Sequence, residues 1–214
     1  GLHMKQLSNY KRVTGYLDKI FNLLNQNYFS GELPKAVITV QSTPKAYGHF
    51  TCYDAWHCAD TGFKEINIGA GTLDRPIENV TATLLHEMIH EYCFIHQIKD
   101  TSRGGSYHNK RFKAEAEQRG LQIDYDSRIG WSITSPTEDL LNFCIENDLT
   151  DILIARNDLI GFNPAITRGK GTASTTRRSS YRKHICPKCL STARTTKDMK
   201  LICGECNEVM IMTD

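Results

Sequence analysis

Apolar residues recur at helical spacing near the start of the chain and again around its histidines. Between Leu7 and Asn27 the apolar positions lie three or four residues apart, which predicts an amphipathic helix. Residues 36–42, 46–53 and 65–69 are rich in β-branched and aromatic side chains and predict short strands. A helix that carries the histidines follows these strands, within the stretch Thr81 to His96.

Two further helices are indicated by their start and stop signals. One begins after His108 and ends at Gly120, a residue that favours helix termination. The other begins near residue 135, with Ser135 as N-cap, Pro136 in the first turn and Glu138 completing a capping box. Helices interleaved with short strands predict a mixed α+β fold.

The length and composition fit one core-bearing domain with a small additional module. The chain has 214 residues, of which 40% are apolar, and a formal net charge of +2. No run of residues is apolar enough for a signal peptide or a membrane span. Eight cysteines without an export signal favour metal ligation over disulfides. We therefore expect an intracellular protein, either cytoplasmic or in the nucleoid or nucleus, with no membrane partner.

The chain divides into four parts by composition. Residues 1–3, ahead of Met4, have the character of an expression scar. Residues 4–165 form the main domain, within which 121–165 is a candidate elaboration. Residues 166–182 are a basic linker rich in Gly, Ser, Thr, Lys and Arg and without any acidic residue, and 183–214 form a cysteine-containing module.

The histidine-rich helix contains the pattern H-E-x-x-H. His86 and His90 are four residues apart and therefore lie one turn apart on one helix face, where both imidazoles can bind one zinc ion. In such sites the intervening glutamate, here Glu87, takes a proton from the water molecule that the zinc activates. Glu91 is expected to be a solvated residue. The pattern predicts hydrolysis of a carbonyl substrate, most often a peptide bond.

A catalytic zinc needs a third protein ligand, and two histidines are candidates. His96 has the spacing of a metzincin ligand, but Cys93 stands where that family has the glycine that breaks the helix. If the helix continues, His96 lies about 240° around the axis from His90 and faces away. His108 follows a turn-forming stretch and precedes a second helix, so it can approach the first helix and leave one zinc position open for water.

Four cysteines near the end of the sequence have the spacing of a structural zinc site. Cys186, Cys189, Cys203 and Cys206 form C-x2-C-x13-C-x2-C, which suits two knuckles around a closed tetrahedral thiolate site. The stretches 199–203 and 208–212 are expected to pair as strands of a zinc ribbon. A redox dithiol is the alternative, and two pairs at this spacing argue against it. The remaining cysteines, Cys52, Cys58, Cys93 and Cys144, are expected to be buried small residues.

The order of these pieces resembles the SprT-like family of Spartan-like zinc metalloproteases. The similarity lies in "YFSGELPKAVITV", "TLLHEMIHEY" and "YHNKRFK", followed by "YRKHICPKC" and "CGEC". It implies a zincin-like domain with a C-terminal zinc ribbon, and it places His108 as the third ligand with Phe112 four residues on. Tyr107 and Asn109 stand where that family usually has glycines. The resemblance also implies DNA repair as a setting, because family members act at DNA.

The basic linker and the ribbon suggest a nucleic-acid partner. Arg177, Arg178, Arg182 and Lys183 would contact phosphates without reading sequence. One hypothesis is therefore a zinc metalloprotease, with one catalytic and one structural zinc, that acts on DNA-associated or DNA-crosslinked proteins, and whose substrate pairs with the edge of the strand at 65–69. The other is a non-proteolytic nucleic-acid-binding or transcription-related protein that uses the zincin fold as a scaffold.

Overall fold

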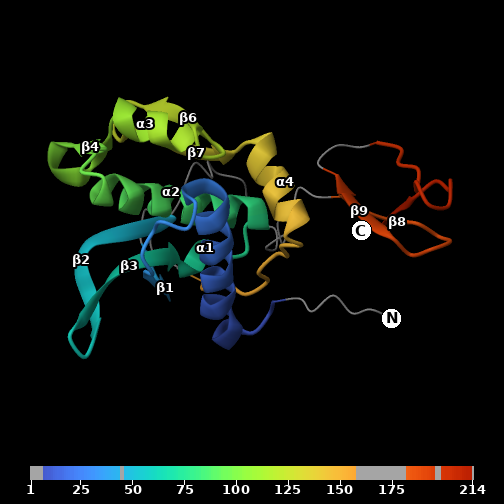
Figure 1. The fold of residues 1–214 in the computed structure, drawn as a ribbon, viewed down its shortest axis with the longest axis horizontal. Coiled ribbons are helices and arrows are strands. Elements are labelled where there is room, and N and C mark those ends of the chain that lie inside the picture. The colour runs from blue at the N-terminus through green and yellow to red at the C-terminus, as the bar shows by residue number, and fades with distance from the viewer. Residues whose placement is uncertain (1–6, 44–45, 158–181, 196–198, 214) are drawn as a thin grey trace, which may run out of the picture.

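The protein has a mixed α+β fold, as the sequence predicts. The structure is a computed structural model that describes residues 7–43, 46–157, 182–195 and 199–213. A long helix, α2 (Ile77–Ile95), crosses the middle of the main domain (Figure 1). On one side of α2 lies the sheet of β1, β2 and β3, and on the other side lie α3 and the sheet of β4 to β7. The histidine-bearing helix is thus enclosed between two layers.

The elements before and after α2 are as follows. The first half of the chain contains η1 (Tyr10–Arg12), α1 (Val13–Phe29), β1 (Val37–Gln41), β2 (Gly48–Cys58), β3 (Thr61–Gly69) and η2 (Ala70–Thr72). After α2 come β4 (Thr101–Ser102), η3 (Arg103–Gly105), β5 (Tyr107–His108), α3 (Lys110–Glu117), β6 (Leu121–Asp126), β7 (Gly130–Pro136) and α4 (Glu138–Glu146). The C-terminal module contains β8 (Arg182–Ile185), β9 (Thr192–Thr195) and β10 (Ile211–Thr213).

The first helix begins later than the sequence pattern predicts. Leu7 forms a parallel bridge with Ile152, and the side chain of Asn9 accepts a hydrogen bond from Lys11 N at the start of η1. α1 therefore starts at Val13 and continues to Phe29. The apolar face of α1 is buried in the common core, since residues such as Leu17 are fully inaccessible. Burial of each such side chain stabilises the fold by about 1.5–3 kcal/mol.

The first sheet has the order β1-β3-β2. β3 pairs in parallel with β1 and antiparallel with β2, so its two edges are both occupied. The prediction that a substrate strand pairs with a sheet edge at residues 65–69 is therefore wrong, because that segment lies in β3 at the centre of the sheet. β2 is longer than its apolar pattern suggests and continues with β3 into an exposed hairpin, across which Lys64 and Asp54 form an ion pair.

The helix predicted near residue 135 starts two residues later than expected. Ser135 and Pro136 belong to β7, where Leu121 of β6 is the partner of Pro136. The N-cap of α4 is Thr137, whose hydroxyl accepts a hydrogen bond from Leu140 N. Threonine caps helices as serine does. The predicted capping box of Ser135 and Glu138 was wrong because Ser135 is part of strand β7.

The hairpin of β6 and β7 and the helix α4 share the core of the main domain. Buried side chains from this part of the chain join the cluster formed by α1 and α2: Leu121, Ile123, Leu140, Phe143, Cys144, Leu149 and Ile152. Tyr28 of α1 donates a hydrogen bond to Asp139 of α4 at 2.7 Å. The described part of 121–165 is therefore packed into the fold rather than attached to its surface.

The C-terminal module is a small sheet in the order β10-β8-β9. The two segments expected to pair do so through a bridge between Ile202 and Val209 and a hydrogen bond from Met210 N to Leu201 O. The second of these segments then continues into β10, which pairs with β8 rather than with its predicted partner. Arg194 of β9 forms an ion pair with Asp148, which follows α4.

Candidate metal centre and catalytic site

Three histidines from two elements converge on one point. His86 and His90 lie one turn apart on α2, and His108 comes from β5. Their Nε2 atoms are separated by 3.2 Å for His86 and His108, 3.2 Å for His86 and His90, and 3.0 Å for His90 and His108. Helical spacing alone brings His86 and His90 together. The position of His108 depends instead on how the chain folds back after α2 to form β5.

The three imidazoles fit a zinc ion. Zinc binds histidine nitrogen at about 2.0–2.1 Å, and tetrahedral geometry then spaces the nitrogens by about 3.3 Å. Burial lowers the pKa of His86 well below its usual value and the pKa of His108 to about 4, with the neighbouring imidazoles acting in the same direction. At neutral pH these two rings are therefore neutral, which is the form that ligates a metal.

Two polar side chains that the sequence analysis missed orient the imidazoles. Nδ1 of His90 lies 2.5 Å from Oδ2 of Asp100, and Nδ1 of His86 lies 2.8 Å from Oγ1 of Thr134. The Thr134 hydroxyl donates to Ser132 O, so it accepts the proton of His86 Nδ1. The rings of His86 and His90 therefore each carry their proton on Nδ1 and present the lone pair of Nε2 to the shared point.

Phe112 packs against all three rings. Its centroid lies 4.5 Å from that of His86, 4.6 Å from that of His90 and 4.8 Å from that of His108, and its side chain is fully buried. Phe112 is placed by α3, whose N-cap Asn109 accepts hydrogen bonds from the amides of Arg111 and Phe112. The helix after His108 thus supplies an aromatic support for the histidine cluster.

Glu87 lies on the face of α2 that meets the start of β2. A Cβ atom added to Gly48 would lie 2.9 Å from Oε1 of Glu87 and 3.1 Å from Cγ2 of Thr83, so only glycine leaves room for the carboxylate there. Burial raises the pKa of Glu87 to about 7, against the opposing effects of His90 and the hydrogen-bonding amide of Phe50. A carboxylate with a pKa near neutrality is suited to exchange protons in both directions.

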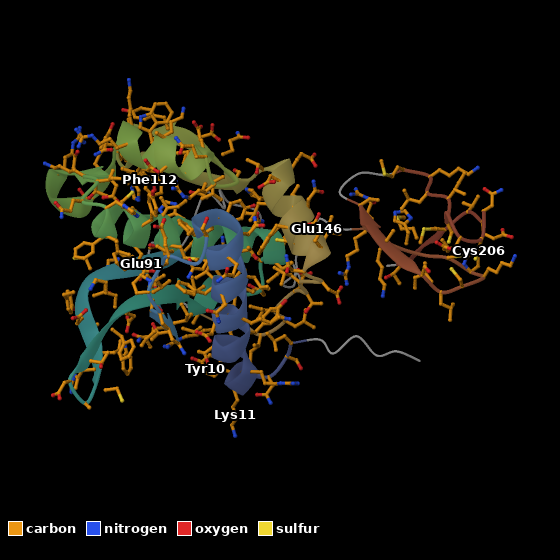
Figure 2. The ribbon with its side chains drawn as sticks, in the orientation of Figure 1. Tyr10, Lys11, Glu91, Phe112, Glu146 and Cys206 are labelled. Carbon is orange, nitrogen blue, oxygen red and sulfur yellow. The ribbon has the colours of Figure 1, made fainter. Side chains whose placement is uncertain are left out.

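Glu91 was expected to be solvated, and this was wrong. Its side chain is fully buried between α2 and β2 (Figure 2), because it lies one turn after Glu87 on the same face of the helix. Burial raises the pKa of Glu91 to about 7, which the charge of Lys64 partly offsets. Helical periodicity could have found this, since residues four apart share a face.

His96 lies outside the histidine cluster. α2 continues through Cys93 to Ile95 without a break, and His96 is its C-cap residue. The ring of His96 packs on Tyr92 at 4.2 Å between centroids, and its Nε2 lies 3.4 Å from Glu32. Because Cys93 stands where a glycine would break the helix, α2 continues and His96 faces away from His86 and His90, as predicted.

The four cysteines of the C-terminal module form a second candidate metal site. One Sγ atom from each of Cys186, Cys189, Cys203 and Cys206 lies within 4.8 Å of the others. In each knuckle the first cysteine accepts a hydrogen bond from the residue after the second cysteine, as Leu190 N donates to Cys186 O and Asn207 N to Cys203 O, at 3.0 and 2.8 Å. Four thiolates leave no open position, so the group is consistent with a structural zinc ribbon.

The other cysteines divide into two pairs. Cys93 and Cys144 are buried, as expected, whereas Cys52 and Cys58 are exposed on β2. The expectation that all four are buried was therefore wrong for the pair on the hairpin, because that hairpin projects beyond the core.

The predicted nucleic-acid-binding residues are only partly described. Arg182 and Lys183 lie on β8, next to β9 in the module sheet. Arg177 and Arg178 lie outside the described residues.

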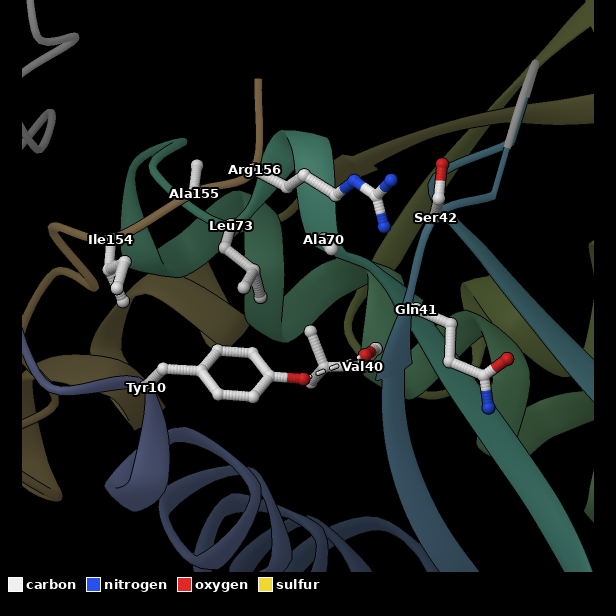
Figure 3. A pocket seen from close by; sticks show the side chains of 9 residues that line it. All are labelled: Tyr10, Val40, Gln41, Ser42, Ala70, Leu73, Ile154, Ala155 and Arg156. Carbon is white, nitrogen blue, oxygen red and sulfur yellow. Dashed lines mark hydrogen bonds between the residues drawn. The ribbon is translucent and has the colours of Figure 1, made fainter. Parts of the chain in front are cut away.

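A separate cavity of about 260 Å³ lies near β1 and η2, away from both cysteine and histidine clusters. Figure 3 shows Tyr10 crossing its floor, where the phenol donates a hydrogen bond to Val40 O at 2.9 Å, and Arg156 along its rim. None of the histidines lines it. No helix in the described part of the chain has the length and apolar character needed to span a membrane.

Comparison with known proteins agrees with the geometry of the histidine site. The model of the SprT-like family matches residues 17–127, a range that includes His86, Glu87, His90 and His108. No curated protein and no solved structure matches the chain. The family match ends before β7, so it does not account for Thr134 or for the cysteine module.

Proposed function

The chain belongs to the SprT-like family, and we propose that it is a zinc metalloprotease that cuts proteins associated with DNA or crosslinked to it. The observation that carries the proposal is the convergence of three imidazoles beside a buried glutamate whose pKa is raised to about 7. A metal site with a purely structural role would need the three histidines, but it would not need a neighbouring carboxylic acid with a raised pKa such as Glu87.

The residues of the site have separate tasks. His86, His90 and His108 would hold the zinc, which when bound polarises the peptide carbonyl and makes a water molecule more acidic. Glu87 accepts a proton from the attacking water and delivers it to the leaving amine. Its raised pKa suits the second task, because a protonated carboxyl can act as an acid near neutral pH.

The free edge of β2 is the structural feature suited to an extended substrate. β2 has only β3 as a partner in the described sheet, and its first residues pass directly over Glu87. A peptide strand added to this edge would bring its backbone next to the glutamate, with main-chain hydrogen bonds supplying affinity without strong sequence preference. Gly48 supports this arrangement because it lets main chain and carboxylate approach closely.

DNA as a partner is supported by charge. The sequence from 166 to 183 contains only basic charged residues, and Arg182 and Lys183 extend this charge onto β8. Such a segment would bind phosphates irrespective of sequence, with an affinity that falls steeply as salt rises.

The experiment compares one DNA-binding test protein in three states: free, bound to single-stranded DNA and crosslinked to it. The native chain is expected to cut the DNA-attached forms faster than the free form, and Glu87→Gln to cut them more slowly by about 100-fold or more. Glu146→Gln, which changes an exposed glutamate on α4, is the matched control and should behave as native. Equal cleavage of free and attached protein would contradict the DNA part of the proposal, and zinc-loaded protein that cuts nothing would contradict the protease part.

A further inference from the structure

A row of three aromatic rings with a cation at each end lies beside the third histidine. The guanidinium of Arg103 lies 4.4 Å from the ring centroid of Tyr107, and the Tyr107 hydroxyl is 3.3 Å from that of Tyr125. The rings of Tyr125 and Trp131 are 5.1 Å apart, and Nζ of Lys113 lies 3.9 Å from the Trp131 centroid. We call these five side chains the aromatic row.

The aromatic row is exposed to solvent, and the strands that carry it pack directly beside His108. Tyr125 is 51% exposed, and Tyr107 and Trp131 are half-buried. Tyr107 directly precedes His108 on β5, and β5 pairs with β7 at Gly130. A Cβ atom at Gly130 would lie 2.1 Å from His108 O and 2.9 Å from the Tyr107 ring, so the two strands are in close contact at this point.

The segment that carries Arg103, Tyr107 and Lys113 of the aromatic row is basic. Residues 99–113 contain five lysines and arginines and a single acidic residue, Asp100, whose carboxylate is bound to His90. Lys110 and Arg111 in this segment are exposed. Of the acidic residues near the row, Asp126 is engaged by Arg128 and by the amide of Ile129, Glu117 lies 3.6 Å from Nζ of Lys113, and Asp124 is exposed on β6. The net charge of the segment is complementary to an anionic partner.

We propose that the aromatic row binds single-stranded nucleic acid, with bases stacked on its rings and phosphates near its cations. Aromatic side chains in a basic surface bind unpaired bases irrespective of sequence, because every base has a π face. In a duplex the bases are already stacked on one another, so an exposed ring such as Tyr125 can contribute little. This inference rests on the DNA partner of the proposed function and adds a second contact surface, distinct from the linker and ribbon.

The position of the row has a consequence for the substrate. A strand held by Tyr107 and Arg103 would lie one residue along β5 from His108, on the face of β5 opposite to the His108 side chain. A protein attached to that strand would then be close to the histidine cluster and to Glu87. The row would thus act as a specificity element for proteins carried by single-stranded DNA.

The test measures binding of a fluorescent oligothymidylate to the full zinc-loaded chain by anisotropy, in the Glu87→Gln background so that no cleavage intervenes. Tyr125→Ala should weaken binding between about fivefold and 150-fold, the range for one base-stacking ring, while Tyr125→Phe keeps the ring and the affinity. Arg103→Ala should reduce the slope of log affinity against log salt by about one. The matched controls, Tyr53→Ala on the β2–β3 hairpin and Lys19→Ala on α1, change exposed residues elsewhere and should bind as native.

Two results would overturn the inference. One is native affinity in both Tyr125→Ala and Arg103→Ala while Arg182→Ala or Lys183→Ala weakens binding, since the ribbon side would then account for all of it. The other is equal affinity for a duplex and a single strand of the same length. Because the readout is binding, a chain that binds as predicted but cuts no protein contradicts the proposed protease activity alone.

Discussion

The imidazole of His90 is bound by the carboxylate of Asp100, with 2.5 Å between Nδ1 and Oδ2. Asp100 lies in the loop that connects α2 to β4, and its carbonyl accepts a hydrogen bond from Asn109 N, directly after the third histidine. Asp100 therefore orients the imidazole of His90 on α2 and also fixes the segment that carries His108. The carboxylate also holds the ring with Nε2 directed at the point shared by the three histidines.

Asp100→Asn should weaken zinc binding at the histidine site by roughly ten- to 100-fold, the usual effect of losing such a supporting carboxylate. Competition with a chromogenic chelator measures this affinity. Asp124→Asn, which changes an exposed aspartate on β6, is the matched control and should leave the affinity unchanged. Unaltered affinity in Asp100→Asn would show that the pair with His90 does not orient the ligand.

Gly48→Ala should lower kcat/KM by roughly ten- to 100-fold, because the added methyl group displaces the Glu87 carboxylate by a fraction of an ångström or more. Zinc content should be unchanged, since the three atoms nearest to the added Cβ belong to Glu87 and Thr83 and not to a histidine. Gly15→Ala on α1 is the control, as nothing lies within 4 Å of its added Cβ. That control should stabilise the fold by about 0.5–1 kcal/mol through helix propensity. Full activity in Gly48→Ala would show that Glu87 does not act from the position that it occupies beside Gly48.

The two metal clusters should load independently, because they share no residue. The native chain should hold about two zinc ions, and His108→Ala and Cys206→Ser should each lose about one, as measured by elemental analysis of dialysed protein. Cys206→Ser should also unfold the ribbon, which has too little apolar surface to fold without metal. Loss of both ions in either variant would contradict independent sites.

Cys93 should resist alkylation by iodoacetamide at about pH 8, while Cys52 and Cys58 react. Burial raises the pKa of Cys93 to about 12, so the reactive thiolate is scarce at that pH. Mass spectrometry of the digested, labelled protein measures each site separately, and labelling in denaturant provides the control in which all react. Equal labelling rates for Cys93 and Cys52 in the folded protein would contradict the observed packing of α2.

The parts of the site that depend on local spacing could be predicted from the sequence. His86, Glu87 and His90 share a helix, so their relative placement follows from helical geometry. The two cysteine pairs are local as well, since each knuckle closes within a few residues. The same spacing argument correctly placed His96 away from the cluster, because Cys93 continues the helix.

The contacts that depend on tertiary packing could not be predicted in this way. Thr134 reaches His86 from 48 residues away, through a β6–β7 hairpin for which no strand was predicted. The position of residues 65–69 at the centre of the sheet depends on the parallel pairing with β1, which no single segment encodes. Pattern reasoning treats each stretch separately, whereas sheet order is decided by how the stretches combine.

The most direct test of the protease assignment is cleavage of a DNA-bound test protein by the native chain and by Glu87→Gln, both shown to carry two zinc ions. Removing the carboxylate should leave metal binding intact and reduce the cleavage rate by about 100-fold or more, because Glu87 acts on the proton and does not hold the metal. New peptide termini found only with the native chain would support hydrolysis at this site. Equal cleavage by both proteins, or no cleavage by either, would contradict it.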